Sequence, residues 1–413
     1  MGNDCQAMFK KIPIDRLRRG MYIQDICGDW MSHPFWRRSF LLKDERDIDR
    51  FREAGIGEVY IDTARGLDDA EGVDAAEVKQ AVQQQIVEAV VQAQPPLRTR
   101  TLAEEMPRAR GIHAQANRVV RDMMRDVRLG RAVSLDDVEP LVDAVTESIL
   151  SNGNALLGLI GIKNKDDYTF QHSVSVCTLM VTFGRSLGMP ADELREAGIG
   201  GLVHDIGKMR VPEEVLNKPG RLTDEEFDLI RRHPGDGHEI LLDLGGVGEV
   251  ALDITRHHHE RIDGSGYPDR LADEQISTMA RMAAIVDVYD AITADRCYHK
   301  GMPATEALRK MWEWSTNHFD RKLLAAFVRC VGIYPVGSLV RLESGRLGVV
   351  IAQSPEEALM PVVRTFFNTR ANAYVTPDVV DLASPRCGDR IVSDESPRRW
   401  KVDPRRFMDP EAA

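Results

Sequence analysis

The spacing of apolar residues changes twice along the chain, and each change marks a different kind of expected secondary structure. Between residues 9 and 63, short apolar runs alternate with turns around one helical segment, Glu45–Ala54, which is typical of a small α+β unit. From residue 70 to about residue 330 the sequence has helical character. After Gly332 it changes to short alternating segments separated by glycine and proline. The pattern therefore predicts a mainly α protein with a small α+β domain first and a short β extension last.

Strands are expected only near the two ends of the chain. They are Lys11–Ile14, Gly20–Ile23, Phe40–Leu42 and Val59–Ile61 in the first unit, and Ser338–Leu342, Gly348–Ile351, Pro361–Arg364 and Val379–Leu382 in the last. Prolines after Gln94 and after Met106 predict helix breaks and a disordered loop near residues 93–110. The charged tail beyond Ser393 contains proline and is expected to be loosely ordered.

The middle of the chain is expected to form a series of helices joined by short loops. A cap at Ser134–Asp137 opens a helix to about Leu150, and the later helices are Tyr168–Leu187, Ala191–Lys208, a helix from the capping box Thr223–Glu226 to His233-Pro234, Val247–His259 and Ser277–Thr293. This organisation predicts three parts. They are an N-terminal domain with a helical connector (1–135), a helical domain (136–335), and a β-rich extension with its tail (336–413).

Composition narrows the class of protein. The 413 residues carry a net charge of −11, which argues against a general binder of nucleic acid or of membrane surfaces. Six scattered cysteines without a C-x-x-C pair suit a reducing compartment and exclude a thiolate zinc site. The first 25 residues lack the apolar region of a signal peptide, and no apolar run is long enough to span a membrane. A cytoplasmic location is therefore expected.

The segment Gly201–Lys208 sets three ionisable side chains, His204, Asp205 and Lys208, in the apolar end of a helix. A buried His-Asp pair needs a partner that offsets its loss of hydration. A hydrogen-bonded core pair would meet that need, and for a lone doublet it is the commoner arrangement. A metal ion would also meet it, because it holds imidazole and carboxylate in the forms that bind metal.

Further candidate ligands in the same helical region favour the metal. The full set is His172, His204, Asp205, His233, His258, His259 and Asp287. Adjacent helical residues point about 100° apart, so His204 with Asp205 suits two metals better than one, with the carboxylate as a bridge. Imidazole and carboxylate without thiolate suit iron, manganese, zinc or cobalt. Asp290 stands three residues after Asp287 and shares its helix face.

Four blocks in this region resemble a known bacterial family, the HD-GYP phosphodiesterases. They are H-D-x-G-K at 204–208, His233-Pro234, H-H-E-x-x-D-G-x-G-Y-P at 258–268, and D-x-x-D at 287–290. The resemblance covers roughly residues 145–335, and the first 135 residues look like the small uncharacterised domain that often precedes HD-GYP domains. The resemblance implies a metal-dependent enzyme that hydrolyses cyclic di-GMP to pGpG, and in some members on to GMP.

The resemblance also implies a role for each candidate. One metal would be held by His172, His204, Asp205 and Asp287, and the other by Asp205, His233, His258 and His259. A hydroxide bridging the two ions would attack phosphorus, with Lys208 supporting the displaced charge. Iron or manganese would be the metals, with zinc, cobalt and nickel as alternatives.

Substrate and partner contacts are implied in the same way. Arg296 resembles the arginine that grips a phosphate, and the second basic contact is either His299 or Lys300. The loop with Gly264 and Tyr267 would contribute to the substrate site and to contacts with diguanylate cyclase (GGDEF) proteins, although glycine and proline explain a tight turn by themselves. The oligomeric state, monomer or homodimer, is left open.

Two departures from the family pattern shape the expectations. Some members bind a third metal through a Glu that is Tyr168 here, so two metals are expected. His257 is an extra histidine in the register of the motif and is expected outside the ligand set. The alternatives are an HD-type hydrolase of another nucleotide, and a non-catalytic module that senses a nucleotide or docks a partner. The complete ligand set argues against the second.

Overall fold

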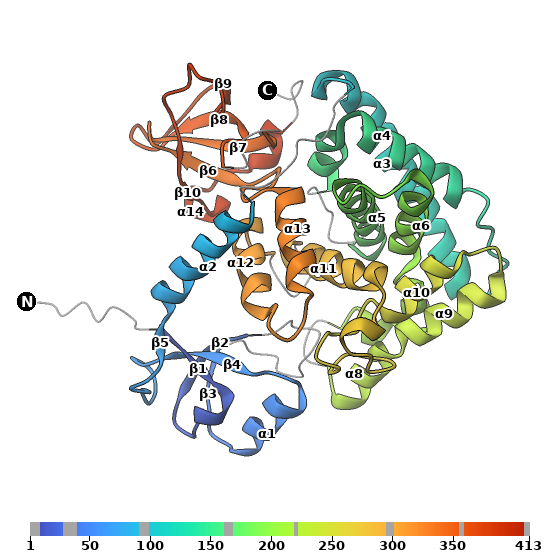
Figure 1. Ribbon diagram of the computed structural model, residues 1–413, viewed down its shortest axis with the longest axis horizontal. Helices are drawn as coiled ribbons and strands as arrows, with labels where there is room; N and C mark the ends of the chain where they lie inside the picture. Colours follow the sequence, from blue (N-terminus) through green and yellow to red (C-terminus); the bar gives the residue numbers. More distant parts are fainter. Residues whose placement is uncertain are drawn as a thin grey trace, which may run out of the picture.

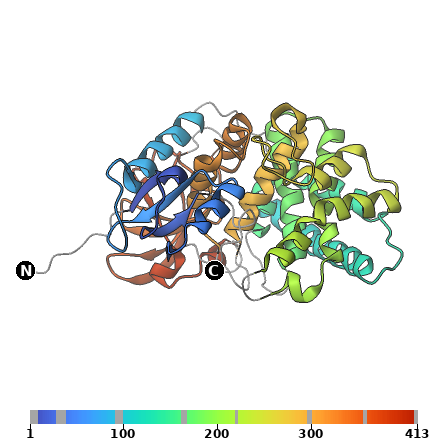
Figure 2. The ribbon, with the colours of Figure 1, turned by 90° about the horizontal axis from the view of Figure 1, so that it is seen from below.

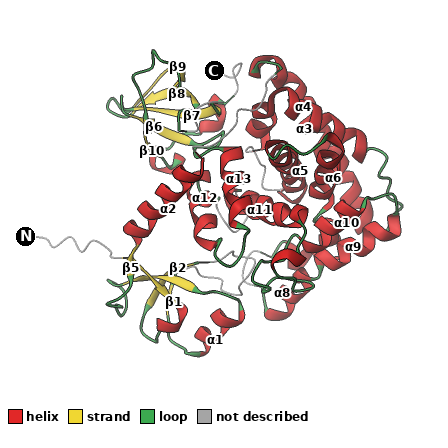
Figure 3. Ribbon diagram, viewed as in Figure 1, coloured by secondary structure: helices red, strands yellow, loops and turns green. Residues whose placement is uncertain are grey.

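The computed structural model describes residues 9–27, 39–90, 99–160, 168–218, 222–294, 301–354 and 359–408. Strands gather in two separate sheets near the ends of the chain, and helices form the rest (Figure 3). The first domain and the β extension lie at one end of the molecule, and most of the helices lie at the other (Figures 1 and 2). The predicted fold class is confirmed. No helix in the described ranges is long and apolar enough to cross a membrane.

The N-terminal domain is a five-stranded antiparallel sheet with one helix. Its elements are β1 (Phe9–Pro13), β2 (Tyr22–Ile26), β3 (Phe40–Leu41), α1 (Arg46–Glu53), β4 (Glu58–Asp62) and β5 (Val73–Asp74), in the strand order β3-β2-β4-β1-β5. Ile12, Ile23, Phe51 and Ile61 are fully buried between the sheet and the helix. The apolar residues of this region therefore form a separate hydrophobic core within the N-terminal domain.

The helical region begins at residue 75 and ends at residue 331. Its helices are α2 (Ala75–Val90), α3 (Leu102–Arg128), α4 (Val138–Ile160), α5 (Tyr168–Ser186), α6 (Ala191–Val203), α7 (Glu213–Leu216), α8 (Asp224–Arg231), α9 (His233–Leu244), α10 (Glu249–His257), α11 (Thr278–Thr293), α12 (Ala304–Trp314) and α13 (Arg321–Val331), with short 3-10 segments Ile206–Arg210 and Asp273–Gln275.

Helix α5 lies at the centre of this region because both of its faces are apolar. Val176 and Phe183 belong to the core that α5 forms with α11, α12 and α13. Val174 and Val181 belong to a second core with α3, α4 and α6. A helix that is apolar on all sides is normally buried among others. The two helices of the predicted connector join these cores: α2 contributes to the first and α3 to the second.

Two sequence expectations about helix ends are wrong. Met106-Pro107 was expected to break a helix within a disordered loop, but α3 runs through it from Leu102. A capping box between Thr101 and Glu104 starts the helix before the proline. Because proline has no backbone N–H, Pro107 leaves only one helical hydrogen bond unmade. Of the expected loop, residues 91–98 lie outside the described ranges. Helix α4 also extends ten residues beyond Leu150, across a kink at Asn152.

The β extension is a second antiparallel sheet of five strands. It consists of β6 (Leu339–Leu342), β7 (Arg346–Ala352), β8 (Val362–Asn368), β9 (Ala373–Asp381) and β10 (Ile391–Asp394), in the order β10-β6-β7-β8-β9, followed by α14 (Pro397–Trp400) and a 3-10 turn at Pro404–Phe407. The expectation of a loose tail is wrong as far as residue 408. The buried Glu395 carboxylate accepts a hydrogen bond from Trp400 Nε1 at 2.8 Å, and Phe407 stacks on Phe366.

The N-terminal sheet packs against the helical region through polar contacts. The Tyr60 hydroxyl donates to Glu313 Oε2 of α12 at 2.7 Å, and Lys310 of α12 forms an ion pair with Asp25. Gly55, just after α1, lies against Ser265 of the glycine-rich loop, where an added Cβ would stand 3.3 Å from the serine Oγ. The first domain therefore contacts the glycine-rich loop that contains Gly264 and Tyr267.

Candidate metal centre

The structure brings all seven candidate ligands into one buried cluster. His172 comes from α5, Asp287 from α11, and the others stand at or next to helix ends: His204 and Asp205 after α6, His233 at the start of α9, His258 and His259 after α10. The most exposed of them, His259, is only 8 % accessible. Such burial of imidazoles and carboxylates requires partners or a bound cation.

The geometry of His204 and Asp205 arises from an early helix end. Helix α6 was expected to reach Lys208 but ends at Val203, and a 3-10 segment follows from Ile206. The chain turns here because its backbone packs directly on the first turn of α9. A Cβ at Gly207 would lie 2.0 Å from the carbonyl oxygen of His233, so only glycine fits. Helix α8 likewise ends at Arg231, which leaves His233 to begin α9.

One oxygen of the Asp205 carboxylate faces the first set of groups. Asp205 Oδ2 lies 2.6 Å from Lys208 Nζ, 3.4 Å from His204 Nε2 and 3.6 Å from His172 Nε2. His172 Nε2 is also 2.9 Å from Asp287 Oδ1. Ligand atoms of His172, His204 and Asp287 lie close enough together to hold one ion.

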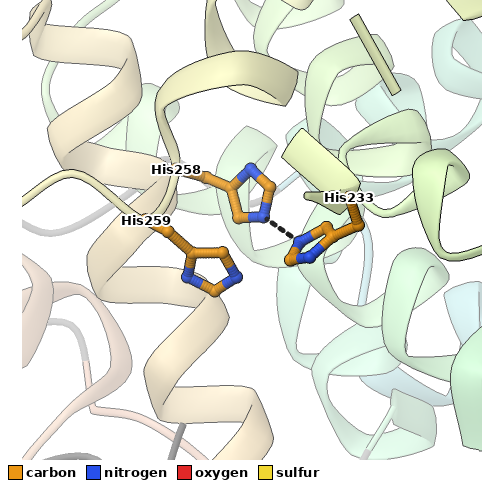
Figure 4. Close-up of side chains that lie close together, drawn as sticks. All are labelled: His233, His258 and His259. Carbon is orange, nitrogen blue, oxygen red and sulfur yellow. Dashed lines mark hydrogen bonds between the residues drawn. The ribbon is translucent and has the colours of Figure 1, made fainter. Parts of the chain in front are cut away.

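The other oxygen of the same carboxylate faces the second set. Asp205 Oδ1 lies 3.3 Å from His233 Nε2 and 3.9 Å from His258 Nε2. The Nε2 atoms of His233 and His258 are 3.2 Å apart, and His259 lies beside both rings (Figure 4). Ligand atoms of these three histidines could hold another ion. Asp205 thus stands between two groups, with one oxygen toward each.

Four of the imidazoles are held by a hydrogen bond on the side away from the cluster. The Nδ1 partners are Asp290 Oδ2 for His172 (2.7 Å), the carbonyl of Gly201 for His204 (2.9 Å), that of Ile230 for His233 (2.7 Å) and that of Thr255 for His258 (2.9 Å). Each partner is an acceptor, so each Nδ1 carries the hydrogen and each Nε2 presents its lone pair to the cluster. Outer hydrogen bonds of this kind orient histidine ligands in metal sites.

Several polar atoms at the centre of the cluster make no hydrogen bond among the described residues, although they are buried. They are His204 Nε2, Asp205 Oδ1, His259 Nε2 and Asp287 Oδ2. Buried polar atoms are rarely left without a partner in this way. Because all four belong to candidate ligands of the cluster, the residues fit a bound cation. Divalent metal ions suit this set of nitrogen and oxygen donors.

The protonation states of His258, His259 and Asp205 agree with that fit. Burial, with the neighbouring imidazoles, lowers the pKa of His258 to about 3 and holds the pKa of His259 well below its usual range, so both rings are neutral. Burial by itself would raise the pKa of Asp205, but the Lys208 ammonium opposes it, and the pKa of this carboxyl group lies well below its usual range. Neutral imidazole and ionised carboxylate are the forms that bind metal.

The structure places the other singled-out residues at different distances from the cluster. The Tyr267 ring lies 4.8 Å from the His259 ring, whereas Gly264 faces Ala272, whose Cβ would lie 3.4 Å from a Cβ added at this glycine. His257 is engaged elsewhere, between Asp253 (2.6 Å) and Asp269 (3.1 Å). Arg296, His299 and Lys300 lie outside the described ranges, as does the side chain of Tyr168.

Two neighbours of the cluster were not among the expected site residues. Asp290 holds His172 from behind, and the D-x-x-D spacing had placed it on the right helix face without indicating a role. Arg231 of α8 lies over the Tyr267 ring, with its guanidinium carbon 4.6 Å from the ring centre. No sequence pattern indicated this stack, because the two residues stand on separate elements.

The helical fold and the buried His-Asp cluster define a metallohydrolase of the HD type. Residues 161–323 match a sequence model described as an HD domain, and residues 9–138 match one described as a domain of unknown function (DUF3391). The chain belongs to the HD-GYP family, in the group that carries this N-terminal domain.

Individual proteins are similar to this chain over different lengths. A cyclic di-GMP phosphodiesterase of Pseudomonas aeruginosa is 48% identical over 394 residues, which cover 95% of this chain and 94% of that protein. A 3'3'-cGAMP-specific phosphodiesterase of Vibrio cholerae is 36% identical over 184 residues, which cover 44% of this chain and 42% of that protein. A solved structure of an HD-GYP-type protein from Bdellovibrio bacteriovorus aligns with a TM-score of 0.47 at 18% identity, covering 77% of this chain and 98% of that one.

Proposed function

We propose that this protein is a metal-dependent phosphodiesterase that hydrolyses cyclic di-GMP to pGpG, with further hydrolysis to GMP left open. The observation that carries the proposal is the position of Asp205, whose two oxygens face different buried imidazoles. A carboxylate placed in this way can bridge two cations. The substrate is inferred from the relative in Pseudomonas aeruginosa, which matches nearly the whole chain.

The two sets of groups define the proposed ligands. His172, His204 and Asp287 would hold one ion with Asp205 Oδ2, and His233, His258 and His259 would hold the other with Asp205 Oδ1. Two ions in such a site activate a water molecule as nucleophile and neutralise charge on the phosphate. Iron or manganese is the proposed metal, as the family resemblance implies, and nitrogen and oxygen donors without thiolate suit either ion.

The protein's own groups would orient the substrate and stabilise the displaced charge. Lys208 lies 2.6 Å from Asp205 Oδ2 and has a side chain 12% exposed, so its ammonium is both anchored and able to reach a phosphate oxygen. Fixed positive charge in a buried site stabilises an oxyanion more effectively than it would in water. Arg296 is proposed to grip the same phosphate with its planar fork of donors, together with His299 or Lys300.

A second candidate substrate follows from another relative. A 3'3'-cGAMP-specific phosphodiesterase is similar to this chain over 184 residues. Both substrates contain two phosphodiesters in one ring and differ in a single base. Discrimination between them therefore depends on base contacts rather than on the proposed metal ligands.

The test is a combined metal and turnover measurement. Protein purified without oxygen should contain two ions per chain, and iron or manganese should restore activity to the chelated protein. Turnover of cyclic di-GMP should exceed that of 3'3'-cGAMP and cyclic di-AMP, with pGpG appearing before GMP by chromatography. Metal-loaded protein that hydrolyses none of the three would contradict the enzyme proposal. A third ion held near residue 168 would contradict the two-metal proposal.

The glycine-rich loop, residues 263–268, is proposed to dock a diguanylate cyclase protein. Asp263, Ser265 and Pro268 of this loop are exposed. The N-terminal domain would regulate the site through its contact with Ser265. The division of the chain into three parts, at residues 135 and 335, is retained in the proposal. Helix α3 links the first two parts. Co-purification with a cyclase domain and light scattering would test the partner and a homodimer.

A further inference from the structure

Arg231 lies beside the cluster, and no described residue is its partner of opposite charge. It ends α8, two residues before His233, and its guanidinium carbon is 4.6 Å from the centre of the Tyr267 ring. The Tyr267 ring in turn lies 4.8 Å from the ring of His259. Among the residues that the structure describes, the Arg231 guanidinium makes no hydrogen bond and no ion pair. Its position is nevertheless fixed by stacking on an aromatic face.

Nearby arginines show the contrast. Arg256 forms a two-pronged ion pair with Asp269, with its nearer contact at 2.6 Å, and Arg281 pairs with Asp320 at 3.0 Å. An unpaired arginine on an open surface is ordinary and indicates nothing. Arg231 differs because it is half-buried and because its stacking partner contacts a candidate metal ligand. Its free donors are therefore held in a fixed place next to the site.

The charge around Arg231 indicates what those donors bind. Two divalent ions would outweigh the carboxylates of Asp205 and Asp287, and Lys208 adds a further positive charge. The positive charge of the metal site would repel the nearby guanidinium. A bound anion would offset this repulsion, whereas an uncharged nucleobase would not. A planar guanidinium binds two oxygens of one phosphate at once. The group that suits Arg231 is therefore a phosphate.

We propose that Arg231, held by Tyr267, binds the second phosphodiester of a cyclic dinucleotide, the one that is not being cleaved. The inference rests on the proposed function and adds a substrate-binding residue to it. A cyclic dinucleotide has two phosphates, and only one can occupy the metal pair at a time. Arg231 then provides affinity for substrates with two phosphates, whatever their bases.

The test compares substrates that have one or two phosphodiesters. For Arg231→Gln, the KM for cyclic di-GMP and for 3'3'-cGAMP should both rise about tenfold, which corresponds to about 1.4 kcal/mol. The affinity for a phosphorothioate analogue of cyclic di-GMP, measured by calorimetry, should fall by the same factor. The loss of kcat/KM on bis(p-nitrophenyl) phosphate, a single phosphodiester, should be about tenfold smaller than the loss on cyclic di-GMP. Arg231→Lys should recover part of the affinity.

The control is Arg232→Gln, which removes the adjacent exposed arginine and should change none of these values. The inference would be overturned if Arg231→Gln left the KM unchanged or raised it for only one of the two cyclic dinucleotides. Loss of bound metal in this variant would also overturn it. An equal loss on bis(p-nitrophenyl) phosphate would also overturn it, since the residue would then act at the cleaved phosphate. Wild-type protein that hydrolyses no cyclic dinucleotide would instead refute the proposed function.

Discussion

Replacing Asp290 by Asn should weaken one metal of the proposed pair and spare the other. Asp290 Oδ2 accepts the Nδ1 hydrogen of His172 at 2.7 Å, and both side chains are almost fully buried. An amide that accepts this hydrogen forms a weaker bond because it lacks the charge. An amide that turns to donate instead moves the imidazole hydrogen to Nε2, the atom that would bind the metal. Either way His172 becomes a poorer ligand.

The size of the effect follows from the position of Asp290 behind the ligand. Loss of an outer hydrogen bond to a metal ligand typically costs 10–100-fold in metal affinity, or about 1.4–2.7 kcal/mol. Only the set with His172 should be affected, because the Nδ1 atoms of His233 and His258 are held by backbone carbonyls. At limiting manganese the variant should therefore keep about one ion per chain, and excess manganese should restore turnover.

The assay is a manganese titration that follows bound metal and cyclic di-GMP turnover on the same samples. Asp253→Asn is the matched control: Asp253 accepts from His257 Nδ1 at 2.6 Å in a similar pair outside the cluster, and its loss should leave both curves unchanged. Two ions bound with wild-type affinity in Asp290→Asn would refute the role given to Asp290. Equal weakening of both ions would refute the separation of the two sets.

Three other substitutions test the remaining assignments. Asp205→Ala should remove both metals and nearly all activity, because both sets share this carboxylate; a variant with two ions and comparable turnover would exclude the bridge. Lys208→Ala should keep its metals and lower kcat by about 10²-fold or more, because the variant lacks one donor that stabilises the transition state. Normal turnover with full metal content would show that Lys208 does not have this role. His257→Ala should keep most activity, since its partners lie outside the cluster, and a loss as severe as that of His258→Ala would contradict this.

Much of the secondary structure could be predicted because local rules decide it. The capping box Thr223–Glu226 forms as its spacing predicts, with Thr223 N donating to Glu226 Oε2 at 2.7 Å. Thr101–Glu104 has the same spacing and also forms a capping box, although Pro107 had led to the expectation of a loop. Proline near a helix start costs little when a cap before it and buried residues after it, such as Ala109 and Ile112, stabilise the helix.

The ends of helices were predicted less well, and the reason lies in packing. Nothing in the residues after Val203 forbids a continued α-helix as far as Lys208. The helix ends because the backbone at Gly207 packs on the carbonyl of His233, which stands on a different helix. The ordered tail has a similar cause, since Glu395 and Trp400 are fixed by contacts with the β extension and with each other. Contacts between distant segments outweigh local preference in both places.

The residue types of the site and their grouping along the chain could be predicted without the structure. Seven candidate ligands stand in five short segments, and the sequence indicated that adjacent His204 and Asp205 suit two ions better than one. Those conclusions depend only on the chemistry of side chains and on helix geometry. The family resemblance followed from the same residues, because four spaced motifs are far more specific than one His-Asp doublet.

Which groups each ligand atom faces depends on how the helices pack in three dimensions. The packing of α5 against α11 places Asp290 behind His172, across 118 residues of sequence. The turn after α6 directs one oxygen of Asp205 toward His172 and the other toward His233. The end of α8 brings Arg231 over Tyr267. These relations could not be predicted locally, because each depends on how separate helices pack around a shared core, and that packing is set by the whole chain at once.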